Sequence, residues 1–440
     1  MPGQEAVMTS TSTSSQTRTP IRRAVIASLV GNALEWYDFF LYGTAAALVF
    51  NHLFFPTIDP LAGTIAAFGT YALGFAARPI GGLIFGHFGD RIGRRAMLVA
   101  TLTLMGAATF LIGLLPTYGQ IGIAAPVLLT VLRVVQGIAV GGEWGGGVLL
   151  ISENADAKRR GMLSALSQTG VGVGFVLSAL VFAVMTGVTT EEQFLAWGWR
   201  VPFLVGVLLM AAGLVIRLKV LETAAFRETR ERHRLPVLEA VRRHPRAVLV
   251  SFGARIAENG GSYVFLVFVL AYARQVGIPD GVALTAVVLG MALEALAMPA
   301  WGALSDRVGR RPVYTFGAVA MVLWAWPFFL LLDTRDTLLV VLAVVVANAV
   351  CHGAMIGTQP AFFTELFGSG VRYSGVALGH EMASVLAGGL SPLIATALLA
   401  WAGGWWPVAI YLAVMGAITV VAVLASQETV ARDLTKIEAR

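Results

Sequence analysis

The chain has 440 residues, of which 57% are hydrophobic and 13% are charged, and its mean hydropathy is +0.77. Soluble domains are about 45–50% apolar and about 25% charged, so this composition excludes an ordinary soluble protein. The single cysteine, Cys351, excludes a disulfide framework and a cysteine metal site. The net charge of +6 comes mostly from short segments between apolar runs, a pattern that indicates membrane orientation rather than nucleic-acid binding.

The first segment, residues 1–20, is polar and rich in Ser and Thr, and we expect it to be a disordered cytoplasmic tail. The apolar run that follows Arg23 is too long for the hydrophobic region of a signal peptide and has no small-residue cleavage pattern near its start. We therefore expect this run to persist as the first membrane span.

Apolar windows of membrane-spanning length predict an all-α integral membrane protein with twelve transmembrane helices. The expected helices cover residues 23–50, 61–85, 96–115, 121–150, 161–187, 198–217, 247–272, 281–304, 312–332, 337–361, 371–400 and 405–425. An even number of spans places both termini on the same side of the membrane.

Basic residues determine the expected orientation. If the N-terminal tail is cytoplasmic, 25 of the 31 Lys and Arg residues lie on the cytoplasmic side, whereas only Arg274 and Arg335 lie in outer loops. This asymmetry follows the positive-inside rule, so both termini, including the tail at 427–440, are expected in the cytoplasm.

The longest inner loop, 218–246, divides the chain into two six-helix halves at 21–217 and 247–426 that are related by sequence. The segment GHFGDRIGRR begins at Gly86, and the similar GALSDRVGRR begins at Gly302, an offset of 216. The segment that ends at Glu35 aligns at an offset of 223 with the one that ends at Glu258. Halves repeated in the same orientation predict an axis along the membrane normal and a binding site between them.

The repeated G-x-x-x-D-R-x-G-R-R motif predicts a conformational gate, since its glycines allow a tight turn and its arginines can form charge-assisted bonds at the inner face. A basic loop that only orients the protein is the alternative for a single copy. We expect the gate to contain both motifs and the acids and arginine at the inner ends of spans 4–5 and 10–11: Gly86, Asp90, Arg91, Gly93, Arg94, Arg95, Glu153, Gly302, Asp306, Arg307, Gly309, Arg310, Arg311, Glu365 and Arg372. Glu153 beside Arg160, and Glu365 beside Arg372, are interpreted as inner-gate ion pairs.

The whole chain after residue 20 resembles the major facilitator superfamily, and within it the metabolite–proton symporter family. The resemblance rests on the loop motif and on the segments GNALEWYDF, RPIGG, RVVQG, GGEWGG and WRVPF. The sequence around these segments is similar to that of the shikimate permease branch, whose relatives carry 2-oxoglutarate, citrate, and proline or betaine. The resemblance implies proton-coupled uptake across a bacterial inner membrane and, through the R-x-x-Q-G pattern, a role for Arg133 in proton coupling.

Ionisable residues inside the spans are the candidate functional residues, because burying a charge in the bilayer is costly. Glu35 and Asp38 lie three residues apart in span 1, so we expect them to titrate as a coupled pair that carries a proton. In span 4 the candidates are Arg133, Gln136 and Glu143. The alternatives are structural: acids that cap helices or pair with arginines, and a permanent salt bridge from Arg133 to span 1.

Substrate is expected to contact further polar residues in spans 2 and 7. Arg78 lies twelve residues before the aspartate of the first loop motif, which corresponds to about 18 Å along a helix. At this depth its side chain cannot reach the membrane surface, so it needs a partner inside the protein. Span 7 carries a polar stripe of Arg255, Glu258, Asn259 and Tyr263, although the first two residues can also simply neutralise one another.

Span 11 contains His380 and Glu381, a pair that departs from the family pattern and that we expect to take part in proton coupling if it lines the cavity. In that case the pair would also count against the substrate of the shikimate branch. A lone histidine in an apolar span is more often a structural core residue, and Glu294 in span 8 has no evident partner in the sequence.

The leading hypothesis is a non-enzymatic secondary transporter that imports a small organic acid, such as shikimate or a dicarboxylate or 2-oxo acid, with protons by alternating access. In-span acids outnumber in-span arginines, so a zwitterion of the proline or betaine type remains open. An intramembrane enzyme and a transporter-like sensor are weaker alternatives, since no H-E-x-x-H, G-x-S-x-G or Walker motif is present and both loop motifs are intact. We expect no cofactor, no metal and no nucleic-acid partner, and a monomer in the lipid bilayer.

Overall fold

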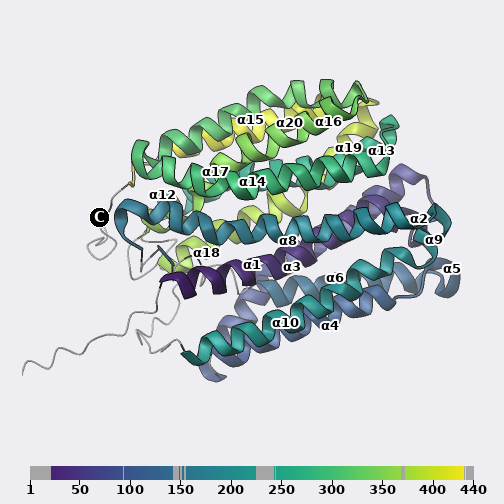
Figure 1. Ribbon diagram of the computed structural model, residues 1–440, viewed down its shortest axis with the longest axis horizontal. Coiled ribbons are helices and arrows are strands. Elements are labelled where there is room, and N and C mark those ends of the chain that lie inside the picture. Colours follow the sequence, from purple (N-terminus) through teal and green to yellow (C-terminus); the bar gives the residue numbers. More distant parts are fainter. Residues whose placement is uncertain are drawn as a thin grey trace, which may run out of the picture.

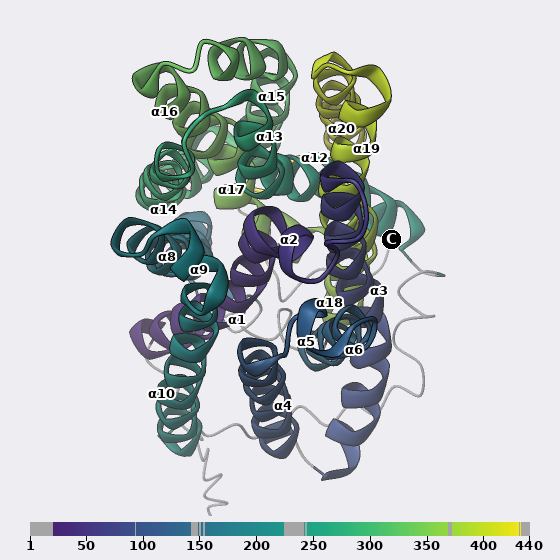
Figure 2. The ribbon, with the colours of Figure 1, turned by 90° about the vertical axis from the view of Figure 1, so that its right-hand side faces the viewer.

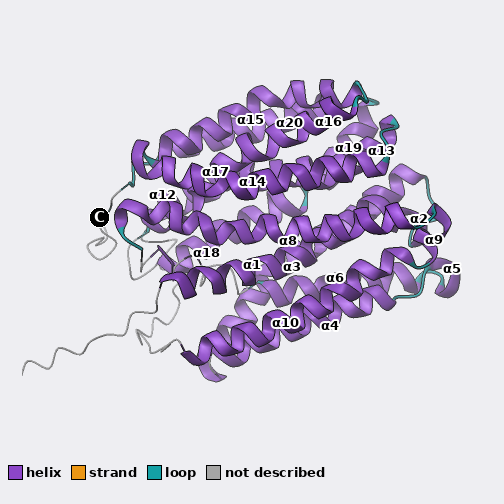
Figure 3. Ribbon diagram, in the orientation of Figure 1, coloured by secondary structure: helices purple, strands orange, loops and turns teal. Residues whose placement is uncertain are grey.

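The computed structural model describes residues 21–92, 94–141, 148, 151–152, 155–223, 242, 244–367, 372–430 and 432. The predicted tail 1–20 and most of both the central loop and the tail 427–440 lie outside these residues. Within the described part every regular element is a helix (Figures 1 and 3), as the composition predicts.

Six helical segments form the first half of the fold. Short helices α5 (Tyr118–Ile121) and α9 (Glu191–Ala196) cap it at one end. The six segments are α1 (Ile21–Ala45), continued by the π-helical turn η1 (Ala46–Phe50) and α2 (Asn51–Leu53); α3 (Pro60–Ile92); α4 (Arg94–Leu114); α6 (Ala124–Val140); α8 (Arg160–Val188), preceded by η2 (Ala157–Arg159); and α10 (Val201–Thr223), preceded by η3 (Gly198–Arg200).

Six further segments form the second half. They are α12 (Pro245–Tyr263) with η4 (Val264–Phe268) and α13 (Val269–Val276); α14 (Asp280–Val308); α15 (Arg310–Asp333); α16 (Thr337–Val345) with η5 (Val346–His352) and α17 (Gly353–Leu366); α18 (Arg372–Ala383) with η6 (Ser384–Gly389) and α19 (Ser391–Ala402); and α20 (Trp406–Leu424).

These twelve segments match the twelve predicted spans, with differences at their ends. Among the described residues, nine segments are long and apolar enough to cross a membrane, and Val99–Leu114 and Ala124–Val140 are shorter apolar helices. Helix α10 continues to Thr223, beyond the predicted end at 217. In the part of the chain that the structure describes, four spans contain a π-helical turn, a feature that hydropathy does not reveal.

The two halves lie side by side, the first in purple to teal and the second in green to yellow (Figures 1 and 2). Helix α8 packs along α14, and α3 packs against η6 and α19, so four spans carry most of the contact between the halves. A Cβ on Gly161 of α8 would lie 2.5 Å from the carbonyl oxygen of Gly302 of α14. This close approach therefore requires glycine.

The middle of the bundle is formed by spans that are buried all round. In the most apolar stretch of Pro245–Val276, 89% of the residues are buried, against 44% in Asp280–Val308. Residues 31–50 of α1 and η1 are likewise buried throughout. Polar side chains on these two central spans therefore point into the protein rather than into lipid, which places the candidate site between the halves.

Candidate functional site

A hydrogen-bonded cluster around Asp38 lies inside the first half. Gln136 of α6 donates from Nε2 to Asp38 Oδ2 over 2.9 Å and also lies 2.9 Å from Thr109 Oγ1. Thr109 of α4 donates a short hydrogen bond to the same carboxylate. Arg133 Nη1 donates to Gln136 Oε1 over 3.2 Å. Gln136 therefore connects the carboxylate to the guanidinium, which do not contact one another directly.

The guanidinium of Arg133 is enclosed by aromatic rings. Its Cζ lies 4.6 Å from the centroid of Phe39, 4.4 Å from that of Tyr42 and 4.7 Å from that of Tyr71. Within the described part of the chain, Nε and Nη2 donate no hydrogen bond and no carboxylate lies within ion-pair distance. A fully buried arginine with two unused donors on one edge is arranged to bind a carboxylate through both donors.

Arg78 lies at depth, as its distance from the loop motif predicts, and joins the two halves. Its Nη2 lies 3.0 Å from Glu35 Oε1 of its own half, and its Nε lies 3.3 Å from Glu381 Oε2 of α18. The rings of Phe39 and Phe75 lie beside it, with centroids at 4.8 and 5.3 Å. Glu35 thus pairs with Arg78, whereas Asp38 belongs to the Gln136 cluster, so the two acids have different partners.

The second half repeats the arrangement of arginine, glutamine and acid. Arg255 Nη1 donates to Glu258 Oε2 over 2.9 Å and to Gln359 Oε1 over 2.6 Å. Gln359 Nε2 in turn donates to Glu258 Oε2 over 2.9 Å. Ser384 of η6 accepts from both Arg255 and Asn259, over 3.3 Å in each case.

The His380–Glu381 pair forms the edge of this cluster that faces the first half. His380 Nδ1 lies 2.9 Å from Glu381 Oε1, and Ser384 Oγ donates to the carbonyl oxygen of His380 over 2.8 Å. Because Glu381 also contacts Arg78, the polar networks of the two halves are joined through this one carboxylate.

Aromatic rings form a layer where the halves meet at mid-depth. The ring centroid of Tyr263 lies 5.4 Å from that of Phe75, 5.8 Å from Tyr71 and 5.9 Å from Phe40. Tyr263 comes from α12 and the other three rings from α1 and α3. A ligand between the halves would therefore contact aromatic faces as well as charged groups.

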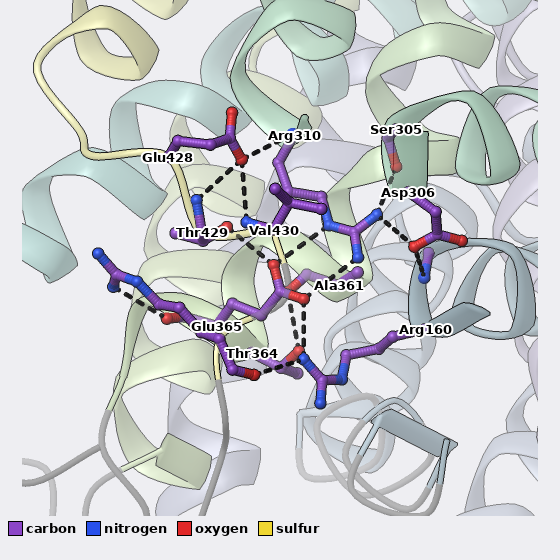
Figure 4. A network of polar contacts seen from close by, with 12 residues as sticks. Arg160, Ser305, Asp306, Arg310, Ala361, Thr364, Glu365, Glu428, Thr429 and Val430 are labelled. Carbon is purple, nitrogen blue, oxygen red and sulfur yellow. Dashed lines mark hydrogen bonds and ion pairs between the residues drawn. The ribbon is translucent and has the colours of Figure 1, made fainter. Parts of the chain in front are cut away.

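At the end of the bundle that carries the loop motifs, Glu365 of α17 is the centre of a second polar network (Figure 4). It lies 3.0 Å from Arg160 Nη1 of α8 and 3.1 Å from Arg310 Nε of α15, and it accepts from Thr429 Oγ1 over 2.8 Å. The sequence suggested Arg372 as the partner of Glu365. The side chain of Arg372 lies outside what the structure describes, and among the described residues Glu365 pairs with Arg160 and Arg310.

Asp306 completes this network across the interface. It accepts hydrogen bonds from the backbone N–H groups of Gly161 and Met162, over 2.8 and 2.9 Å, and its Oδ1 lies 2.8 Å from Arg310 Nη1. The loop turns at Gly309, whose φ of 107° disfavours any residue with a side chain. The aspartate of the second motif thus holds α8 of the other half.

The segment after α20 also belongs to the network, a role that was not predicted from the sequence. In the sequence, Glu428-Thr429 is recognisable only as a repeat of Glu222-Thr223, at an offset of 206. Glu428 accepts the backbone N–H groups of Arg310 and Arg311, over 2.8 and 3.1 Å, at the start of α15. Burial raises the pKa of Glu428, but these and two further backbone donors, Thr429 and Val430, lower the pKa below its usual range overall. Arg311 also donates to the carbonyl oxygens of Val423 and Leu424.

Several predicted residues cannot be placed in a contact. Gly86, Asp90 and Arg91 lie in α3, Arg94 and Arg95 begin α4, and Arg372 begins α18, but the structure does not describe their side-chain surroundings. Gly93, Glu143 and Glu153 lie outside the described residues. Arg307 is exposed at the end of α14.

The opposite end of the bundle contains a cavity of about 910 Å³ between the halves that was not predicted. Its lining includes His52, Asp59 and Glu191 from the first half and Arg274 and Asp280 from the second. Arg274 Nη1 donates to the carbonyl oxygen of Leu48 over 2.7 Å, while its Nη2 pairs with Asp280 at 2.5 Å. The bond to Leu48 connects the halves at the end remote from the loop motifs.

Comparison with known proteins identifies the family. The family model described as Major Facilitator Superfamily matches residues 28–392 and, in a second alignment, residues 260–439. The chain belongs to the major facilitator superfamily. It is therefore a membrane transporter rather than an enzyme, as predicted.

Individual relatives agree with this assignment. The chain is 44% identical over 398 residues to the shikimate transporter of Escherichia coli (strain K12), covering 89% of this chain and 91% of that protein. It is 34% identical over 436 residues to the proline/betaine transporter of Salmonella typhimurium, covering 94% and 85% respectively. The fold is similar to a partially occluded inward open structure of the xylose transporter XylE from E. coli, with a TM-score of 0.68, 18% identity and coverage of 93% and 98%.

Proposed function

We propose that this transporter imports a small organic acid, with shikimate as the first candidate, together with protons across a bacterial inner membrane. The two halves move about the site between them by alternating access, and the protein works as a monomer with both termini in the cytoplasm. The resemblance to the shikimate transporter and the basic loops support this proposal.

One observation carries the substrate class: the two unused donors of Arg133 inside its aromatic cage. A permanently charged guanidinium needs a counter-charge in a buried site, and a substrate carboxylate supplies one with matching two-point geometry. Phe39, Tyr42 and Tyr71 add flat apolar faces that suit a small ring. Arg78 is not free to bind a substrate carboxylate in this way, since two carboxylates of the protein already contact it.

Proton coupling follows from the position of Asp38. With Asp38 ionised, its charge balances that of Arg133 through Gln136. When Asp38 binds a proton, Arg133 is left without a counter-charge, so the site then favours an anion. Proton and anion therefore bind with positive coupling, and each raises the affinity for the other.

The test is uptake of labelled shikimate by proteoliposomes with an inward proton gradient. We expect a protonophore to abolish uptake. In Asp38→Asn, uptake should no longer depend on the proton gradient, and in Arg133→Gln it should be lost. Glu192→Gln, at an exposed acid on α9, is the matched control and should transport normally. Shikimate uptake that a protonophore leaves undiminished would contradict proton coupling.

A zwitterionic substrate is the second candidate, and the aromatic layer favours it. The faces of Tyr71, Phe75 and Tyr263 can attract a quaternary ammonium group, while Arg133 binds its carboxylate. Competition separates the two candidates: excess unlabelled betaine or proline should not reduce uptake of labelled shikimate if the organic acid is the substrate. Strong inhibition by betaine, with saturable betaine uptake, would favour the zwitterion.

A further inference from the structure

The two halves differ in charge at equivalent positions. Glu35 and Glu258 are repeat mates at an offset of 223, and Arg78 and Glu294 are separated by 216, the offset that relates the two loop motifs. In the first half these positions hold an acid and an arginine at 3.0 Å. In the second half both positions hold acids, so Glu294 has no arginine as its repeat counterpart, and Glu258 pairs instead with Arg255 on its own helix.

His352 lies between these two acids. Its Nδ1 makes a short contact with Glu294 Oε1, and its Nε2 lies 3.5 Å from Glu258 Oε1. All three side chains are at least 96% buried. His352 is the last residue of the π-helical turn η5, and such turns frequently occur at functional sites because they change the direction of a side chain.

Around His352, the negative charges outnumber the positive charges unless a proton is bound. Helix α12 contributes Arg255 and Glu258, and α14 contributes Glu294. Helix α15 contributes Tyr314, which accepts a hydrogen bond from Gln359 of α17, and the sequence of α16 contains no titratable side chain. Among the described residues, two acids thus face one permanent cation around His352, and an uncompensated buried charge is strongly destabilising.

Glu294 also has an unused oxygen. Within the described residues its Oε2 has no hydrogen-bond partner, although the residue is fully buried on α14. A buried carboxylate oxygen without a donor is costly when ionised, and a proton bound to the Glu294–His352 pair removes that charge.

We propose that Glu258, His352 and Glu294 form a second proton-binding site, in the second half, that takes up and releases one proton in each transport cycle. The proton is held between His352 Nδ1 and Glu294 Oε1, and only the N–H or O–H bond there forms and breaks. This inference rests on the proposed proton-coupled transport and assigns it two proton sites, one in each half.

The site is connected to the interface between the halves through Glu258. When the proton leaves, Glu258 and Glu294 repel each other across His352, and Glu258 is drawn towards Arg255. Arg255 contacts Ser384, which bonds to the backbone of His380 beside Glu381, the partner of Arg78. Through these contacts, loss of the proton affects the Arg78–Glu381 ion pair, which joins the two halves.

The test measures charge movement with shikimate in proteoliposomes. Two protons with one monoanion carry one net positive charge, so a negative inside potential should accelerate wild-type uptake. Glu294→Gln and His352→Arg should each move one proton fewer, so the proton-to-shikimate ratio falls from two to about one and the potential no longer accelerates uptake. Exchange of labelled for unlabelled shikimate, which requires no net proton movement, should persist and shows that the variants fold. Glu192→Gln should behave as wild type.

A variant that exchanges shikimate but keeps the wild-type ratio overturns the proposal, as does a wild-type ratio of one. If a protonophore leaves wild-type uptake intact, the proposed function fails and the site is judged by a second measurement. The ¹⁵N NMR signals of labelled histidine, with His352 assigned by its loss in His352→Gln, should report a change of protonation state when the pH is varied, and the pH at which it occurs should shift in Glu294→Gln. A His352 signal that keeps one state throughout overturns the site.

Discussion

Arg160 of α8 lies 3.0 Å from Glu365 of α17, so a cation of the first half is neutralised by a carboxylate of the second half. Arg310, from the second loop motif, lies on the same carboxylate. The end of the bundle that carries the loop motifs is therefore held together by Glu365 with its two arginine partners and by Asp306, which accepts hydrogen bonds from the start of α8. At the opposite end the halves are joined by the more exposed bond from Arg274.

Replacement of Glu365 should open the end that carries the loop motifs. Glu365→Gln removes the carboxylate that pairs with Arg160 and leaves Arg310 with Asp306 alone. Removing one partner of a buried pair typically costs about 3–5 kcal/mol. We expect a lower midpoint of thermal unfolding and faster labelling of a cysteine introduced at Ala165, one turn along α8, in a Cys351→Ser background. Labelling as slow as in the Glu192→Gln control would contradict a gating role for Glu365.

The glycine contact between α8 and α14 should tolerate no side chain. Gly161→Ala places a Cβ 2.5 Å from the carbonyl oxygen of Gly302, and forced overpacking costs about 1–3 kcal/mol. Gly187→Ala is the control, because a Cβ at this position of the same helix would have nothing within 4 Å, and it should be neutral or slightly stabilising. Thermal unfolding and the uptake rate of both variants distinguish a specific contact from general sensitivity of α8.

The stabilisation by Glu428 should depend on pH. Because its pKa in the folded protein is below its usual value, its contribution is present above the unfolded value of about 4.3 and is lost as the pH falls towards the lower, folded value. The difference in unfolding midpoint between wild type and Glu428→Gln should therefore be largest near neutral pH and shrink below about pH 4. A difference that stays constant over this range would show that the carboxylate charge is not responsible.

The bond from Arg274 to Leu48 should limit opening at the end with the cavity. Arg274→Gln removes the bond, and Asp280→Asn frees the same arginine from its carboxylate. Both changes should increase labelling of a cysteine introduced at Thr186, which lines the cavity, by a membrane-impermeant reagent. Arg335→Gln, at an arginine that follows α15 at the same end of the bundle, is the control, and equal labelling in all three variants would count against the bond as a restraint.

The sequence predicted the fold well because membrane spans follow from local hydropathy. It also predicted that Arg78 lies deep and needs a partner, since depth follows from helix rise alone. It did not predict which acid meets which arginine, because those contacts join spans far apart in the chain, as in Arg78 with Glu381. Glu294 was left without a partner for this reason, although His352 lies beside it.

Other contacts were missed because the residues carry no signal of their own. Thr109 is an ordinary threonine in an apolar span, and its contact with Asp38 depends on how α4 packs beside α1. The π-helical turns depend on backbone geometry rather than on composition. Glu428 and Thr429 were visible only as one copy of a repeated pair, and their role follows from the path of the chain after α20.

The contact of Thr429 with Glu365 has a consequence for biosynthesis. Arg160 is made early, but Thr429 emerges from the ribosome only after the twelfth span has been translated. The seal that joins the two halves therefore cannot be completed until α20 is made, and a nascent chain with eleven spans lacks one of the donors to Glu365. The last donor of this network is thus added only after all twelve spans have been made.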